Sequence, residues 1–297
     1  MNQTPTVPQA NHADGGALLG AGAVRQLAAS LDLTPTKQRG QNFVVDANTI
    51  RRIVTLAGVG GDDVVIEVGP GLGSLTLGLL EVGAAVTAIE IDERLAGLLP
   101  TTVATRMPKA QDRLRVVTSD AMLVDELPGP DPSALVANLP YNVSVPVLLH
   151  LLERFPSWRK GLVMVQLEVC DRLVAKPGAK VYGVPSAKVA WYADAVRVGT
   201  VAPKVFWPVP NVDSGLVKLE LRDPPATRAS RAQVFEVIDL AFAQRRKMLR
   251  AALAGRCGGS AAAAEVIASA GVDPMARGET LDITQFAAIA EAVFGPR

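Results

Sequence analysis

The sequence is poor in the residues that build metal sites and disulfide frameworks. Its 297 residues include two cysteines, Cys170 and Cys257, and two histidines, His12 and His150. The cysteines form no CxxC pair, so we expect no disulfide framework, no metal site and no Cys-His nucleophile. His150 falls on a predicted helix and is interpreted as a packed or surface residue. This composition is typical of a cytoplasmic protein.

Long apolar runs are also missing, although apolar residues make up 49% of the chain. No run reaches the roughly 18 residues that a membrane-spanning helix needs, so we expect no membrane association. No lysine or arginine precedes Arg25, and the basic start of a signal peptide is therefore lacking. Residues 1–24 are rich in Pro, Gly, Ala, Asn and Gln, and they are predicted to form a disordered tail.

The chain has almost no net charge, at +1, but its charges are segregated. Residues 62–135 hold twelve acidic and five basic residues, whereas residues 154–204 hold nine basic and three acidic ones. The run Gln244–Arg256 adds five basic residues and no acidic one. Such blocks can be ordinary solvated surfaces, but together they favour a polyanionic partner. Within the last run, Arg245, Arg246, Lys247 and Arg250 are the candidates for contact with such a partner.

Strand-like runs alternate with helix-like stretches between residues 64 and 167. The predicted strands are Val64–Val68, Ala85–Glu90, Leu114–Thr118, Ala134–Asn138 and Gly161–Leu167. They are almost continuously apolar, as parallel strands buried on both faces are. Two later strands, Trp191–Val198 and Ser214–Leu221, have no clear helix between them and can pair antiparallel at a sheet edge. The pattern predicts an α/β fold with a mostly parallel sheet built from βαβ units.

The chain beyond residue 221 is predicted to be a small helical domain. Residues 222–227 are interpreted as a linker, and Ser230 is the predicted N-cap of a long helix. Its apolar face comprises Val234, Ile238, Ala241, Phe242 and Leu249, and Cys257-Gly258-Gly259 ends it. A second helix runs from Ser260 to a C-cap near Gly271, and a last one begins near Thr284. We thus expect a tail over 1–24, an α/β domain over 25–221 and a helical domain over 222–297.

A glycine-rich turn follows the first strand of the α/β domain. Gly69, Gly71 and Gly73 let the main chain approach a ligand closely and expose the start of the next helix. Glu90 ends the second strand, at the distance that suits ribose hydroxyls. Asp120 follows the third strand and can accept from an adenine amino group. The loop departs from the dehydrogenase G-x-G-x-x-G pattern, and with Glu67 and Asp120 it favours S-adenosylmethionine over a nicotinamide.

The fourth strand ends in Asn138-Leu139-Pro140-Tyr141. An amide oxygen and a main-chain carbonyl there can accept both N–H groups of an exocyclic amine, and the tyrosine ring can stack on the base. Enzymes that act on a base extrude it into such a pocket. The competing interpretation is a strand followed by a plain Pro-Tyr turn. Phe206 is a candidate for the opposite face of the base, or else a core residue at a strand edge.

Eight motifs in order give the chain a strong resemblance to the small-subunit ribosomal RNA adenine N6-dimethyltransferases, a family of class I S-adenosylmethionine enzymes. The resemblance runs from about Thr36 to the C-terminus. The motifs are Gly40–Phe43, Glu67–Gly73, Glu90–Asp92, Ser119–Met122, Asn138–Ser144, Phe206–Ser214, Gln244–Lys247 and Arg277–Leu281. Val44 and Val143 depart slightly from the family pattern, and the N-terminal tail is longer than is typical.

The resemblance implies a Rossmann-like fold with a seven-stranded sheet and a small all-α C-terminal domain. It implies cofactor contacts at Asn42, Val44, Gly69, Glu90, Asp120 and Asn138, to which the turn adds Gly71. It also implies transfer of methyl groups to N6 of two adjacent adenosines near the 3′ end of 16S rRNA, within the immature small ribosomal subunit. We expect a monomer, because nothing in the sequence suggests an oligomer.

Three other functions stay open at this point. A non-catalytic assembly factor would use the fold only to bind the immature small subunit, but the intact glycine turn and Asn138–Tyr141 argue against pure scaffolding. Large-subunit rRNA adenine methyltransferases of the macrolide-resistance type more often have isoleucine at the position of Leu139. DNA N6-adenine methyltransferases commonly have Asp-Pro-Pro-Tyr or Asn-Pro-Pro-Tyr in place of this motif, which Leu139 disfavours.

Overall fold

The computed structural model describes residues 17–33 and 42–295, and these residues divide into two compact units. The first unit contains residues up to 170 and residues 196–220, and the second contains residues 171–195 and 221 onward. The sequence placed 171–195 in the first domain, because the strand predicted from Trp191 was read as part of one continuous sheet domain. The structure instead groups these residues with the C-terminal helices. None of the described helices is both long and apolar enough to cross a membrane.

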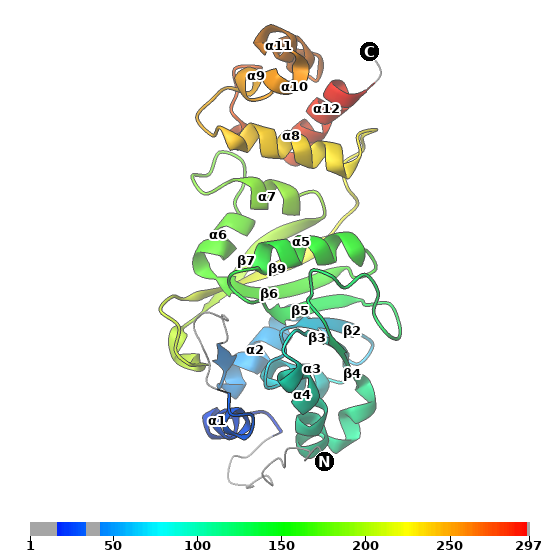
Figure 1. The fold of residues 1–297 in the computed structure, drawn as a ribbon, viewed down its shortest axis with the longest axis vertical. Helices are drawn as coiled ribbons and strands as arrows, with labels where there is room; N and C mark the ends of the chain where they lie inside the picture. The colour runs from blue at the N-terminus through cyan, green and yellow to red at the C-terminus, as the bar shows by residue number, and fades with distance from the viewer. Residues whose placement is uncertain (1–16, 34–41, 296–297) are drawn as a thin grey trace. The chain divides into compact units, whose positions relative to one another are not determined.

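A seven-stranded sheet forms the centre of the first unit, with strands in the order β4-β3-β2-β5-β6-β9-β7 (Figure 1). The strands are β2 (Val64–Val68), β3 (Ala85–Glu90), β4 (Leu114–Thr118), β5 (Ala134–Asn138), β6 (Lys160–Gln166), β7 (Ala193–Val201) and β9 (Ser214–Leu221). The pairs from β4 to β6 are parallel, whereas β9 runs antiparallel to β6. This arrangement confirms the predicted mostly parallel seven-stranded sheet with an antiparallel edge.

Helices and short turns cover this sheet. They are α1 (Ala21–Ser30), α2 (Ala47–Ala57), α3 (Ser74–Glu81), α4 (Glu93–Arg106), the 3-10 helix η2 (Pro108–Arg113), α5 (Ser144–Arg154), α6 (Leu167–Leu173) and the 3-10 helix η3 (Pro203–Val205). Asp46 and Asp92 cap α2 and α4 through their side chains. Helix α4 packs on β3 and β4, and α2 packs on α3 and β6. The apolar runs of β2, β3, β5 and β6 are largely buried, whereas the edge strand β4 is only partly buried.

A second, two-stranded sheet was not predicted from the sequence. In it β1 (Phe43–Val44) pairs antiparallel with β8 (Phe206–Trp207), so that Val44 lies opposite Phe206. Phe206 is only 2% exposed and belongs to the core of the first unit. Of the two interpretations of Phe206, its burial favours the core residue, and Phe206 is not among the residues that line the cavity described below.

The predicted disordered tail is too long by several residues. Leu18 and Leu19 are buried, and α1 begins at Ala21 and buries Val24 and Leu27 in the core of the first unit. The sequence concealed this because the buried face is built from small and apolar residues within an alanine- and glycine-rich stretch. The remainder of the predicted tail, residues 1–16, lies outside the described residues, as do Gly40 and Gln41 of the first motif.

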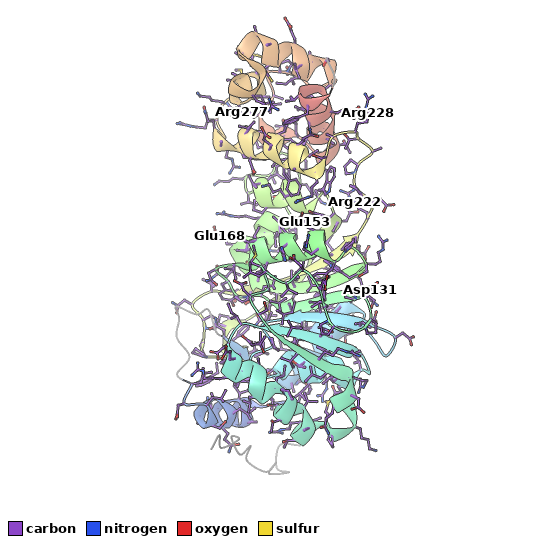
Figure 2. The ribbon with its side chains drawn as sticks, turned by 45° about the vertical axis from the view of Figure 1, so that its right-hand side comes forward. Asp131, Glu153, Glu168, Arg222, Arg228 and Arg277 are labelled. Atoms are coloured by element: carbon purple, nitrogen blue, oxygen red, sulfur yellow. The ribbon has the colours of Figure 1, made fainter. Side chains whose placement is uncertain are left out.

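The second unit is helical and has its own core. Its elements are α7 (Val184–Val189), α8 (Arg231–Ala243), α9 (Leu249–Ala252), α10 (Ala254–Cys257), α11 (Ser260–Ser269), the 3-10 helix η4 (Gly278–Thr280) and α12 (Ile283–Phe294). Ser230 and Asp282 form capping boxes at the starts of α8 and α12. Arg228, labelled in Figure 2, fastens the segment before α8 to α12 by donating to Glu291 at 2.7 Å.

The long helix predicted to extend from Ser230 to Cys257 is interrupted. Helix α8 ends at Ala243, where Gln244 leaves the helical conformation with φ −130°. The next residues bind elsewhere in the second unit: Arg245 donates to Glu279 at 3.0 Å and to the carbonyl of Lys180, and Leu249 N donates to Ala276 O at 2.8 Å. These contacts replace the helical hydrogen bonds that the apolar periodicity alone predicted.

Candidate active site

The carboxyl ends of four adjacent parallel strands open into one cavity of ≈ 980 Å³. Its walls include Glu67 from β2, Glu90 from β3, Asp120 after β4 and Asn138 from β5. In open parallel sheets the ends of the strands form the crevice in which ligands bind. The predicted residues Asn42, Val44, Gly69, Gly71, Leu139, Pro140 and Tyr141 line the same cavity.

The glycine turn forms the floor between β2 and α3. Gly69 and Gly71 have left-handed backbones, with φ 65° and 57°, which only glycine adopts easily. A Cβ at Gly71 would lie 2.7 Å from the ring of Phe43, so a side chain there has no room. A Cβ at Gly69 would lie 3.8 Å from Pro140 and 3.9 Å from the carbonyl oxygen of Asn138. The turn and the Asn138–Tyr141 segment are therefore direct neighbours.

Two buried carboxyl groups face this cavity. Glu67 is 1% exposed and accepts a hydrogen bond from Thr76 Oγ1 at 2.7 Å. Burial raises the pKa of Glu67 to about 8, the nearby charge of Glu90 adds to this, and the Thr76 hydrogen bonds oppose it. Burial also raises the pKa of Glu90, although the main-chain N–H groups of Asp92 and Gly71 donate to it at 3.0 and 3.1 Å and counteract that effect. The site therefore favours a ligand with cationic or hydrogen-bond-donating groups.

Glu67 makes the stability of the unliganded protein depend on pH. The folded-state pKa of Glu67 lies above that of an unfolded carboxyl group. Between about pH 5 and pH 8 the folded protein therefore retains a proton that the unfolded chain has already lost. The free energy of unfolding should therefore fall as the pH rises through this window. Glu67→Gln keeps an acceptor for Thr76 and removes the part of this pH dependence that Glu67 causes.

We expect Glu67→Gln to stabilise the protein relative to wild type at pH 8.5 by up to a few kcal/mol, and much less at pH 5. Urea denaturation of both proteins at several pH values measures this difference. Glu90 is present in both proteins, but its charge acts on Glu67, so the difference between the proteins reports the loss of Glu67 together with its coupling to Glu90. Parallel stability profiles for the two proteins would show that Glu67 does not titrate abnormally.

Asn138 is oriented by a hydrogen bond to Asn42, which belongs to the Gly40–Phe43 motif. Its Nδ2 donates to the carbonyl oxygen of Asn42 at 3.2 Å. Because the amide NH₂ is used in this way, Oδ1 is the atom that can accept from a ligand. On the other side of the cavity Asp120 is held by Met122, whose N–H donates to Asp120 Oδ1 at 2.9 Å. The main chain beside it is fixed to β3, since Ser119 N donates to Glu90 O at 3.0 Å.

The Asn138–Tyr141 segment is anchored to the neighbouring strand β6. Leu139 N donates to Met164 O at 3.1 Å, and Leu139 itself is 1% exposed. The ring of Tyr141 is half-buried and lines the cavity. Burial raises the pKa of Tyr141, so its phenol is neutral at physiological pH. An aromatic face and the acceptor groups of Asn138 are thus presented together.

Ser74 is a cavity residue that sequence reasoning did not select. It is 7% exposed, and its Oγ has no hydrogen-bond partner among the described residues. An unsatisfied buried hydroxyl costs stability, so it points to a polar ligand at this wall. The sequence offered one indication of this residue: Ser74 stands where the dehydrogenase pattern has its last glycine.

Several candidates lie apart from the cavity lining. Phe206 is in the core, and His150 is packed, with Nε2 2.9 Å from Val124 O. The predicted RNA-binding residues Arg245, Arg246, Lys247 and Arg250 are exposed in the second unit. Within the described residues, no group of three or more His, Cys, Asp or Glu is arranged to hold a metal ion.

The sheet order and the cavity at the ends of its parallel strands define a class I methyltransferase. Among solved structures, a dimethyladenosine transferase from Plasmodium falciparum matches with a TM-score of 0.70 and 22% identity, over 83% of this chain and 95% of that one. The 23S rRNA methyltransferase ErmE matches with a TM-score of 0.61 and 26% identity, over 85% and 99% of the two chains.

Sequence relatives identify the family. The model of the ribosomal RNA adenine dimethylase family matches residues 34–293. Ribosomal RNA small subunit methyltransferase A of Cutibacterium acnes is 66% identical over 281 residues, 93% of this chain and 94% of that protein. The protein of the same name from Streptomyces coelicolor is 65% identical over 276 residues, 93% and 96% of the two chains. The chain belongs to the ribosomal RNA adenine dimethylase family.

Proposed function

We propose that this protein transfers methyl groups from S-adenosylmethionine to N6 of two adjacent adenosines in the 3′-terminal hairpin loop of 16S rRNA, giving N6,N6-dimethyladenosines. The observation that carries the proposal is the shared cavity, in which the glycine turn, Glu90 and Asp120 meet Asn138 and Tyr141. The high identity to small subunit methyltransferases over nearly the whole chain supports the choice of RNA.

The cavity residues fit the proposed cofactor. Glu90 suits ribose hydroxyls, Asp120 suits an adenine amino group, and the unpartnered Ser74 hydroxyl suits a polar group beside the glycine turn. A positively charged ligand would favour the ionised forms of the two buried acids, Glu67 and Glu90, whose pKa values burial raises. When bound there, S-adenosylmethionine supplies a methyl carbon made electrophilic by its sulfonium.

The protein's part in the reaction is to position the acceptor amine. The N6 lone pair of adenine is delocalised into the ring and is a poor nucleophile. Asn138 Oδ1 and the carbonyl of Leu139 or Pro140 can accept hydrogen bonds from both N6 protons, which favours a more pyramidal nitrogen and orients its lone pair. No strong general base is required, because the methylated amine becomes acidic and can lose its proton afterwards. This fits the lining of the cavity, which includes no histidine among the residues that the structure describes.

Tyr141 offsets the cost of removing the base from its stack. Extruding a base costs about a few kcal/mol, and less in a loop than in a duplex. Stacking on an aromatic side chain returns roughly 1–3 kcal/mol per base. Tyr141 alone can therefore offset much of this cost, and a hairpin loop is a more favourable substrate than a helix.

A transfer assay tests the proposed substrate. The protein is incubated with labelled S-adenosylmethionine and with undermethylated small subunits, large subunits or DNA, and the labelled nucleotide is then mapped. We expect N6,N6-dimethyladenosine at two adjacent positions of the small-subunit RNA. Label in large-subunit RNA would indicate an activity of the macrolide-resistance type. Binding to small subunits without transfer would indicate a non-catalytic assembly factor.

The second unit supplies a candidate RNA surface. Arg246, Lys247 and Arg250 are exposed, and they follow the interruption after α8. Arg245 is paired with Glu279 and bonded to Lys180, so its first role is to hold this turn. We propose that the exposed cations contact phosphates of the immature small subunit, which would also allow the protein to act in small-subunit assembly.

Charge reversal at Arg246 and Lys247 should weaken RNA binding and flatten its dependence on salt. Removal of two phosphate contacts is expected to lower the slope of log K against log salt by roughly 1–2. Filter binding between 50 and 200 mM salt measures it, with Arg245 left intact to preserve the turn. Lys109→Glu, an exposed change within the acidic part of the chain, is the control. An unchanged slope in the double variant would exclude an RNA contact at these two residues.

A further inference from the structure

The Phe206–Ser214 motif reaches the candidate active site through its last residue. Ser214 Oγ and Tyr141 Oη lie 2.9 Å apart, within hydrogen-bond distance. Ser214 is fully buried at the start of β9, whereas Tyr141 is half-buried and lines the cavity. The contact therefore connects the interior of the sheet to the aromatic wall of the site. A role for this serine did not emerge from the sequence, which directed attention to Phe206.

Ser214 is itself held rigidly. It lies opposite Gln166 in the β6–β9 register, and Leu167 N donates to Asp213 O at 2.9 Å. The next residue is a glycine that a side chain could not replace, because a Cβ at Gly215 would overlap the Cβ of Cys170. The start of β9 therefore cannot shift without disrupting its packing, and the hydroxyl of Ser214 is a fixed reference point.

Tyr141 is consequently held at both ends. Its segment is anchored by the hydrogen bond from Leu139 N to Met164 O on β6, and its hydroxyl is anchored by Ser214 on β9. A tyrosine fixed only through its backbone can rotate about its side-chain torsions. The second anchor fixes the position of the hydroxyl and, with it, the direction of the long axis of the ring.

Ring placement matters most for the second of two methyl transfers. Unmethylated N6 has two protons for the acceptors at Asn138 and the adjacent carbonyl, whereas N6-monomethyladenine has only one. The remaining hydrogen bond defines the position of the base less completely. Stacking on Tyr141 then has to supply a larger share of the alignment.

We propose that Ser214 is a positioning residue that fixes the ring of Tyr141 and thereby promotes the second methyl transfer. The inference rests on the proposed function, since it presupposes that Tyr141 stacks on the target base. Proton transfer is not involved, and the hydrogen bond acts only by holding the Tyr141 side chain in one direction.

Product analysis tests the inference in the full-length protein. With undermethylated small subunits, Ser214→Ala should slow the second transfer about tenfold and the first only about twofold, so that monomethyladenosine accumulates. The KM for S-adenosylmethionine should stay within about twofold of wild type. Ser133→Ala removes a serine hydroxyl at the opposite end of β5 from Asn138 and is the matched control. A wild-type product ratio for Ser214→Ala would overturn the inference.

A double variant separates this hydrogen bond from other effects of the substitution. If Ser214 acts through the hydroxyl of Tyr141, Tyr141→Phe should also accumulate monomethyladenosine. Tyr141→Phe/Ser214→Ala should then be no worse than the worse single variant. Multiplying defects in the double variant would mean that Ser214 acts by another route. If Ser214→Ala does not fold, Ser214→Cys, with its weaker hydrogen bonding, takes its place in the same comparison.

A spectroscopic measurement tests the contact without any catalysis. The chain has three tyrosines, at positions 141, 182 and 192, so 3-fluorotyrosine labelling should give three fluorine resonances. Tyr141→Phe assigns one of them, and Ser214→Ala should shift or broaden that resonance alone. An unaffected Tyr141 resonance would overturn the inference. Because this measurement needs no RNA, it tests the contact between Ser214 and Tyr141 even if the transfer assay shows that the proposed substrate is wrong.

Discussion

Asn138→Ala is expected to lower turnover about tenfold or more, with little change in affinity for RNA. The variant loses the Oδ1 acceptor for the target amine and the Nδ2 donor that binds the carbonyl of Asn42. Both losses disturb the alignment of the target amine. This alignment stabilises mainly the transition state, so kcat should fall more than the affinity for RNA does. RNA affinity depends chiefly on phosphate contacts made elsewhere.

Single-turnover methylation and RNA binding, measured on the same preparations, check this expectation. Asn211→Ala is a suitable control, because Asn211 is an exposed asparagine that does not line the cavity. Asn138→Asp gives a further comparison, since it retains acceptor oxygens but cannot donate to Asn42. Equal losses of turnover and of RNA affinity in Asn138→Ala would argue that this residue shapes the binding surface rather than the reaction.

Gly71→Ala is expected to reduce affinity for S-adenosylmethionine about tenfold or more. Its left-handed backbone costs roughly 1–2 kcal/mol for a residue with a Cβ. That Cβ would also lie 2.7 and 2.9 Å from two ring carbons of Phe43, so the turn or the ring must move. Movement of the turn disturbs the hydrogen bond from Gly71 N to Glu90. A cost of about 1.4 kcal/mol corresponds to a factor of ten in affinity.

Calorimetric titration with S-adenosylmethionine measures the effect. Gly97→Ala is the control, because Gly97 lies within α4 and a Cβ there meets nothing within 4 Å. The control should bind like wild type, and it should be slightly more stable because alanine favours helices. Wild-type affinity in Gly71→Ala would mean that the glycine turn does not shape the cofactor site.

The parallel strands could be predicted from the sequence because the apolar pattern that indicates each strand lies within the strand itself. Four of them, from Val64–Val68 to Ala134–Asn138, have the predicted bounds, since each is a short, largely apolar run within the sequence. The polar residues at the ends of these strands are brought together by the topology alone, because parallel strands have their carboxyl ends at one edge of the sheet. The convergence of Glu90, Asp120 and Asn138 on one cavity could therefore be predicted before any coordinates were known.

Features that depend on contacts between distant segments could not be predicted. The β1–β8 pair has two residues in each strand, too few for a period to be visible, and its partners are separated by more than half the chain. The break after Ala243 depends on contacts of Arg245 and Leu249 with remote residues. Likewise the sequence motif ending at Ser214 was visible, but its contact with Tyr141 was not.

The most direct test is a crystal structure of the protein with a non-reactive analogue of S-adenosylmethionine and an RNA hairpin that carries the two adjacent adenosines. The account predicts an extruded adenine on the ring of Tyr141, with N6 within 3.2 Å, the usual hydrogen-bond limit, of Asn138 Oδ1 and of the carbonyl of Leu139 or Pro140. An adenine bound away from Asn138, or an analogue bound outside the cavity of the glycine turn, would contradict it.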